Sequence, residues 1–236
     1  MGVATLQRVY DRLRKSNLRW MVRYSVHRAY SSFWEHRLGI RTRGNEIWDG
    51  SQVSDLGNHA YSPTSYLDFR KSIRWIPRPL EDVVLLDYGS GMGRAVLMAA
   101  TYPFRTVIGV EISPALTRIA EDNLGWARGK LKCRDVRLVT ADAVAYPFPP
   151  EVTVVFFYNP FGEDILIQVL DNIERSLDEH PRTLTVIYAN PRRFENVVCR
   201  HGWLRKEGEF SGLHPHVICR HETDRKNGRP APVSLP

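Results

Sequence analysis

The chain has 236 residues, of which 43% are hydrophobic and 25% are charged, ordinary values for a globular protein that folds in water. Its longest strongly apolar stretch, residues 152–158, is far too short to span a bilayer, and no apolar signal-peptide core follows the N-terminus. Three cysteines without a CxxC pair argue against a disulfide framework, so a cytoplasmic location is expected.

The net charge of +7 is concentrated in the N-terminal segment. Residues 1–45 hold ten of the 33 Lys and Arg residues and only two of the 26 acids. Apolar residues recur there at helical spacing, which predicts a basic helix. Capping of the sheet by this helix is the favoured interpretation. Docking to nucleic acid or another acidic partner, binding to an anionic membrane surface, and mitochondrial targeting are the alternatives.

Residues 45–64 are polar and rich in turn residues, so 1–64 is predicted as a basic helical segment followed by a lid loop. Ser62 is expected to cap a short helix with Pro63 in its first position. The apolar face of that helix would pack on the sheet through Tyr66, Phe69 and Ile73. The candidate lid residues, which would lie over a crevice at the edge of the sheet and contact a substrate, are Tyr61, Thr64 and Tyr66.

Strand and helix patterns alternate through residues 65–221, which we predict as one catalytic domain, with a loose tail over 222–236. The fold class is α/β, a doubly wound, seven-stranded, mostly parallel sheet that ends in a C-terminal antiparallel hairpin. Six strands should be parallel and one antiparallel. The expected strands are 83–86, 106–110, 136–140, 152–158, 184–188, 203–210 and 216–221. The expected helices of the core begin near Arg94, Pro114, Asp164 and Pro191.

The stretch "LLDYGSGMGRAVLMAA" places three alternating glycines between the first strand and a helix. Such a loop lets the backbone approach a ligand at the carboxyl end of the sheet, where the helix directs its positive dipole end. A dinucleotide loop has the order G-x-G-x-x-G, but Arg94 stands where its third glycine would be. Asp87 would also repel a pyrophosphate. Both features disfavour NAD and favour a ligand that carries positive charge.

These residues resemble the first motif of class I S-adenosylmethionine-dependent methyltransferases, and the resemblance runs over about residues 80–190. It implies S-adenosyl-L-methionine as cofactor. Glu111, at the end of the second strand, matches the acid that binds the ribose hydroxyls, and Asp142 matches an acid near the adenine amine. The candidate cofactor-binding residues are Asp87, Gly89, Ser90, Gly91, Gly93, Arg94, Glu111, Ile112, Asp142 and Ala143. Singly, Glu111 could be a helix N-terminal acid and Asp142 a turn residue.

The fourth strand ends in "FFYNPF", where such enzymes transfer the methyl group. The amide oxygen of Asn159 can accept a hydrogen bond from an amine, and aromatic rings can pack against a flat or cationic acceptor. The stretch resembles the Asn-Pro-Pro-aromatic motif of enzymes that methylate planar nitrogens, with one proline missing. It also resembles the Asn-Phe stretch of the non-SET histone-lysine methyltransferases. The candidate catalytic residues are Tyr158, Asn159, Pro160 and Phe161.

The second resemblance is favoured, because "YSPTSYLDFRKSIRWI" is similar to the segment that precedes the core in that group. A nitrogen acceptor is therefore expected, with a protein lysine slightly preferred over RNA or a small amine. A cofactor-binding scaffold without turnover and an NAD-dependent oxidoreductase are the remaining alternatives. Histidines and cysteines near the C-terminus fit no familiar zinc spacing, so no metal is expected.

Overall fold

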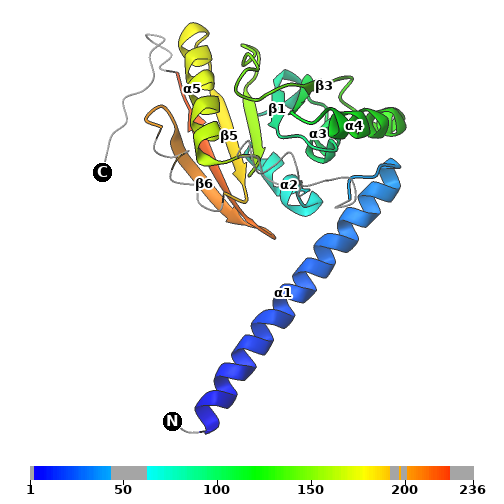
Figure 1. Ribbon diagram of the computed structural model, residues 1–236, viewed down its shortest axis with the longest axis vertical. Coiled ribbons are helices and arrows are strands. Elements are labelled where there is room, and N and C mark those ends of the chain that lie inside the picture. The colour runs from blue at the N-terminus through cyan, green and yellow to red at the C-terminus, as the bar shows by residue number, and fades with distance from the viewer. Residues whose placement is uncertain (1–2, 44–62, 192–196, 198–200, 224–236) are drawn as a thin grey trace.

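The computed structural model describes residues 3–43, 63–191, 197 and 201–223, and Figure 1 shows a layered core from which one long helix projects. The sheet has seven strands in the order β3-β2-β1-β4-β5-β7-β6. The first five strands pair in parallel, β7 is antiparallel to β5, and β6 is antiparallel to β7. The predicted fold class, with six strands in one direction and one opposed, is confirmed. The strands are β1 (Val84–Tyr88), β2 (Thr106–Glu111), β3 (Asp135–Thr140), β4 (Val154–Tyr158), β5 (Leu184–Ala189), β6 (Arg205–Ser211) and β7 (Pro215–His221).

Helices cover both faces of this sheet, as continuous apolar runs in the central strands predict. One core cluster joins β1, β2 and β4 to the helices on the first face, where the rings of Phe69 and Phe156 meet edge to face at 5.1 Å. A second cluster lies under α5 on the opposite face. The helices of the core are α2 (Tyr66–Ser72), α3 (Arg94–Ala100), α4 (Pro114–Ala127) and α5 (Glu163–Glu179), with short 3-10 turns η1 (Ile73–Trp75), η2 (Leu80–Asp82) and η3 (Arg128–Lys130).

Helix α2 begins later than the sequence predicts. Its N-cap residue is Ser65, not Ser62, and Ser62 lies outside the described residues. The Ser65 hydroxyl makes no capping bond, because it lies 2.6 Å from Nδ1 of His27 on α1. The expected helix from Pro191 to Arg200 falls almost wholly on residues that the structure does not describe.

Helix α1 (Val3–Leu38) is 36 residues long, which corresponds to about 54 Å at 1.5 Å per residue. Only its C-terminal third packs on the core, through the buried residues His27, Ser31, Glu35 and Leu38. Before that point the helix leaves the core, and Trp20 and Val22 are each 56% exposed. The capping interpretation therefore describes residues 27–38, while one turn earlier the Arg23 guanidinium donates to the backbone carbonyls of Ser211 and Gly212. No described helix combines the length and apolarity needed to cross a membrane.

Candidate functional site

The glycine loop connects β1 to α3 at the point where the strand order reverses between β1 and β4. Its glycines all have positive φ, which an L side chain rarely adopts. At Gly89 a Cβ atom would lie only 2.5 Å from Cβ of Pro160. The loop therefore packs directly against the turn after β4, and this contact brings the predicted cofactor loop beside the predicted transfer site.

Backbone hydrogen bonds fix the loop to the next strand. The N–H groups of Gly89 and Ser90 both donate to the carbonyl of Val110, at 2.8 and 3.1 Å, and Gly93 donates to the carbonyl of Ser90 at 2.9 Å. The Ser90 side chain is buried against Gly109, where a Cβ would meet its Oγ at 2.9 Å. The loop is thus held in one conformation before any ligand binds.

Glu111 lies at the end of β2 and closes the loop from the other side. Its Oε2 accepts from the N–H of Gly91 at 2.8 Å, and its Oε1 accepts from the N–H of Ser113 at 2.9 Å. Burial raises the pKa of this carboxyl, while hydrogen bonds from the backbone of Ser113, Gly91 and Ile112 oppose the rise. Each carboxylate oxygen has a second lone pair, so Glu111 can accept further hydrogen bonds. The adjacent Ile112 is 40% exposed and gives this edge an apolar surface.

Asp87 lies inside β1 and is fully buried, and no cation pairs with it among the residues that the structure describes. Burial raises the pKa of its carboxyl well above the ordinary value, and the negative charge of Glu111 raises it further. An ionised carboxylate in such a place is costly unless a cation neutralises it. The pair Asp87 and Glu111 therefore fits a ligand with a positive charge and hydroxyl groups.

Asp142 follows β3, and its position is less distinctive. The residue is exposed, and its Oδ1 accepts from the N–H of Val144 at 2.9 Å, a bond within its own turn. The neighbouring Ala143 is buried in the core cluster under α5. The N–H of Ala141 donates to the carbonyl of Glu111 at 2.9 Å, so Asp142 stays close to the end of β2. Asp142 therefore stabilises its own turn, which is one of the two roles that the sequence predicts for it. Its contact with a cofactor remains a prediction.

Asn159 occupies the turn after β4 in an unusual state. Its φ is +45°, and its side chain is buried with 7% exposure. The amide Oδ1 has no hydrogen-bond partner among the residues that the structure describes. Because a buried, unpaired carbonyl oxygen costs about 1–3 kcal/mol, a bound donor is the simplest account of it.

The aromatic residues beside Asn159 divide between two environments. Tyr158 is half-buried, and its ring centroid lies 6.0 Å from that of His214 at the start of the β7 hairpin strand. Phe161 is 4% exposed and packs edge to face against Tyr88 and Phe157 in the core. Phe161 therefore supports the turn from below, and its ring is not presented to an acceptor.

The Arg94 side chain binds the N-terminal segment. Its guanidinium donates to Oε1 of Glu35 at 2.8 Å, to Oγ1 of Thr42 at 2.7 Å and to the carbonyl of Thr64 at 3.1 Å. It also stacks over the ring of Tyr66, at 5.4 Å from the centroid. Any contact from Arg94 to a cofactor would have to come from its backbone.

Two of the three candidate lid residues lie beside the Arg94 side chain. Thr64 and Tyr66 are buried beneath Arg94, and Tyr61 lies outside the described residues. Glu35 and Thr42, which complete the Arg94 cluster, were not singled out from the sequence. Glu35 had a signal, since it is one of only two acids in a strongly basic segment.

Comparison with known proteins agrees with this geometry. Residues 85–180 match a family described as a methyltransferase domain. An RNA methyltransferase from Salinibacter ruber, solved with S-adenosyl-L-homocysteine, is similar at 22% identity and a TM-score of 0.50, over 74% of this chain and 97% of that one. A precorrin-6y C5,15-methyltransferase from Geobacter metallireducens is similar at 17% identity and a TM-score of 0.52, over 71% and 93% of the two chains. Curated protein sequences give no significant match. Residues 85–180 thus form a methyltransferase domain, on a fold shared with solved methyltransferases of which one binds S-adenosyl-L-homocysteine.

Proposed function

We propose that this methyltransferase methylates a nitrogen that carries an N–H group, held in place by the side chain of Asn159. The buried Oδ1 of Asn159, without a partner among the described residues, is the observation that carries the proposal. Such an oxygen accepts a hydrogen bond from an amine and directs the nitrogen lone pair away from itself. A carbon acceptor has no polar hydrogen to donate to this oxygen.

The residues of the loop fit the cofactor. S-adenosylmethionine supplies a methyl group already activated on a sulfonium, together with an ammonium group and ribose hydroxyls. The buried Asp87 carboxylate offers a charge partner to the ammonium group, and Glu111 offers acceptors to the hydroxyls. The Gly89 position leaves no room for a side chain, so the backbone itself forms the wall of the site. The chain's own residues therefore contribute binding, orientation and exclusion of water.

Two acceptor classes fit Asn159. The sequence resemblance favours a protein lysine. The burial of Phe161 removes the aromatic ring that the planar-nitrogen motif would place on a base, which also supports lysine. RNA is the second candidate, and a basic, aromatic cavity on the same domain favours it. For either acceptor, the nitrogen must arrive with a free lone pair and lose its proton to solvent after transfer.

The test is methyl transfer from labelled S-adenosylmethionine onto a protein extract, total RNA and a pool of small amines. Label that enters one fraction and is released by the matching protease or ribonuclease is the expected result. Titration of the purified protein with S-adenosylhomocysteine and NAD runs in parallel. Tight binding of S-adenosylhomocysteine without any labelling would replace the proposal with a scaffold function, and preferential binding of NAD would refute it.

Replacing Glu111 with Ala should weaken binding of S-adenosylhomocysteine roughly tenfold to a hundredfold, because charge-assisted hydrogen bonds are worth about 1.5–3 kcal/mol. Calorimetric titration measures the dissociation constant. Glu121→Ala removes an exposed acid from α4 and serves as the control, with affinity expected to stay within twofold. A folded Glu111→Ala protein with wild-type affinity would exclude Glu111 from the cofactor site.

Asp87→Asn should change the thermal stability of the ligand-free protein and its affinity for S-adenosylhomocysteine in opposite directions. Because burial raises the pKa of Asp87 in the folded chain, the folded protein holds this proton to higher pH than the unfolded chain does. The carboxylate thus lowers stability as pH rises above its ordinary pKa of about 3.9, and the penalty is complete above the raised pKa. We expect Asn to raise the melting temperature of the ligand-free protein near pH 7, with the gain disappearing toward about pH 4.

The same variant should bind S-adenosylhomocysteine at least about tenfold more weakly, because the ammonium group loses its charge partner. Thermal unfolding across pH and calorimetric titration supply the two measurements. If Asn lowers stability near neutral pH, Asp87 has a structural partner in the ligand-free fold and its assignment to the ammonium group fails.

A further inference from the structure

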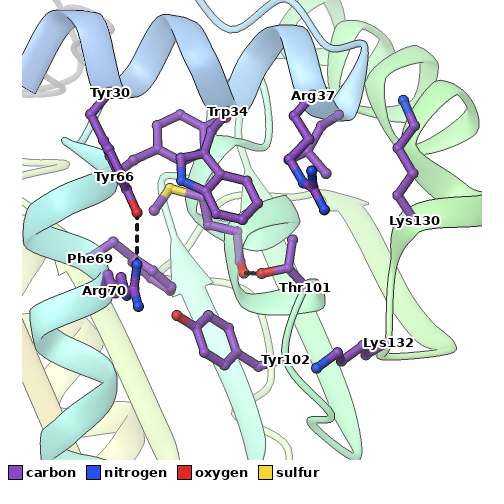
Figure 2. Close-up of a pocket in the computed structure, with 12 residues that line it drawn as sticks. Tyr30, Trp34, Arg37, Tyr66, Phe69, Arg70, Thr101, Tyr102, Lys130 and Lys132 are labelled. Carbon is purple, nitrogen blue, oxygen red and sulfur yellow. Dashed lines mark hydrogen bonds between the residues drawn. The ribbon is translucent and has the colours of Figure 1, made fainter.

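A cavity of about 670 Å³ lies between α1 and the core, away from the glycine loop. Its walls come from α1, α2, the C-terminal end of α3 and the segment after α4 (Figure 2). The glycine loop precedes the other end of α3, so about 10 Å of helix separates the two sites. The volume is within the range of ligand pockets in proteins.

Four cations surround this cavity, and none of the described residues that line it is acidic. They are Arg37, Arg70, Lys130 and Lys132. All four are exposed, and no ion pair joins any of them to an acid among the residues that the structure describes. Cations gathered around one cavity repel each other unless an anion enters. Four of them around the rim suit a ligand with several negative charges better than a monocarboxylate, which one cation satisfies.

Aromatic rings form the interior of the cavity. Trp34 extends from α1 into its centre, with Tyr30 and Tyr102 on either side (Figure 2). The Tyr30 hydroxyl accepts from Nη1 of Arg70 at 2.9 Å, and the Arg37 guanidinium lies 5.8 Å from the centroid of the Trp34 ring. Two of the cations are thus already placed beside the rings. Rings of this kind stack with nucleobases, and neighbouring cations bind the phosphates between them.

We propose that this cavity binds a single-stranded nucleic acid, with one base stacked on Trp34 and the backbone phosphates on the four cations. The exposed side chains of Arg19, Arg23 and Arg28 extend the positive charge along the described part of α1. The inference concerns binding alone and holds whichever nitrogen the enzyme methylates. If RNA is the methyl acceptor, this cavity is its docking site.

The experiment measures fluorescence anisotropy of a labelled ten-nucleotide RNA of mixed sequence with the full chain, without cofactor, over a range of salt concentrations. Lys130→Ala/Lys132→Ala should weaken binding at least about tenfold at low salt and lower the slope of log K against log salt by about 1.4, since each phosphate contact on a single strand contributes about 0.7. Trp34→Leu should weaken binding by roughly 5- to 150-fold through lost stacking.

Arg175→Ala/Arg205→Ala removes the same charge from exposed positions on α5 and β6 that do not line the cavity, and its affinity should stay within about twofold. Binding of S-adenosylhomocysteine shows that each variant is folded and separates this result from a failure of methyl transfer.

Equal affinity of the cavity and control variants for RNA overturns the proposal. Binding of anionic vesicles of phosphatidylglycerol and phosphatidylcholine that depends on the cavity cations, in the absence of RNA binding, overturns it in favour of a membrane. If adenosine monophosphate displaces the labelled RNA and binds with the same affinity as the RNA, the cavity is a mononucleotide site, and the single-strand assignment is overturned.

Discussion

Replacing Asn159 with Gly is expected to lower turnover at least about a hundredfold and to leave the affinity for S-adenosylhomocysteine within a few-fold of wild type. Displacement of a reacting atom by 1 Å can have a kinetic effect of about that size. Glycine is the informative substitution because Asn159 has a φ of +45°, which glycine adopts without strain and alanine does not. Loss of rate would then report the missing amide oxygen and not a distorted turn.

Asn190 offers a matched control. It follows β5, has a φ of +53° and is buried to the same extent, and its backbone N–H donates to the carbonyl of Pro215. Asn190→Gly should keep most of the activity, while Asn159→Asp, which retains an acceptor oxygen, should keep more activity than Asn159→Gly. Equal turnover by wild type and Asn159→Gly would show that the acceptor nitrogen lies elsewhere.

The strands of the core were predictable because each carries its own local signal. β1, β2 and β5 are short apolar runs buried at every position, and the sequence places them within two residues of their observed ends. The glycine loop was predictable for a related reason. The loop needs a positive φ at three positions, and glycine is the residue that adopts such a φ without strain, so the three glycines indicate the loop directly. Glu111 contacts the loop through the N–H of Gly91, and the binding of a cofactor by Asp87 and Glu111 remains a prediction.

Side-chain direction after a turn was not predictable in this way. Phe161 was expected near the acceptor, but the chain reverses at Asn159 and directs the ring into the core beside Phe157. The start of α2 was misjudged for a similar reason. Ser62 looks like a cap, yet the helix begins at Tyr66, where Ser65 lies against His27 from a helix far away in the sequence. In both cases, contacts between residues far apart in the sequence determine the conformation that the structure shows.

Arg94 is the clearest example of a long-range contact. From the sequence, a charged residue at this point speaks against NAD and suggests a place near the cofactor. In the structure Arg94 is 5% exposed, and its guanidinium donates to residues on α1 and on the segment before α2. The residue that starts the helix of the glycine loop is therefore also the residue that holds the N-terminal segment. We therefore expect this contact to hold α1, and with it the wall of the cavity around Trp34, in place.

Arg94→Ala should accordingly lower the free energy of unfolding by about 3–5 kcal/mol, because it leaves the buried Glu35 carboxylate without its main partner and frees the carbonyls of Thr42 and Thr64. Arg43→Ala is the control. Arg43 binds the same carboxylate, through Oε2 at 2.7 Å, but its side chain is 41% exposed, so a loss of at most about 1 kcal/mol is expected. Chemical denaturation measures both values, and limited proteolysis at α1 shows whether the helix separates from the core first. A stability change in Arg94→Ala no larger than that in Arg43→Ala would mean that α1 docks through its apolar contacts alone, and the buried ion pair would then have no part in holding the N-terminal segment.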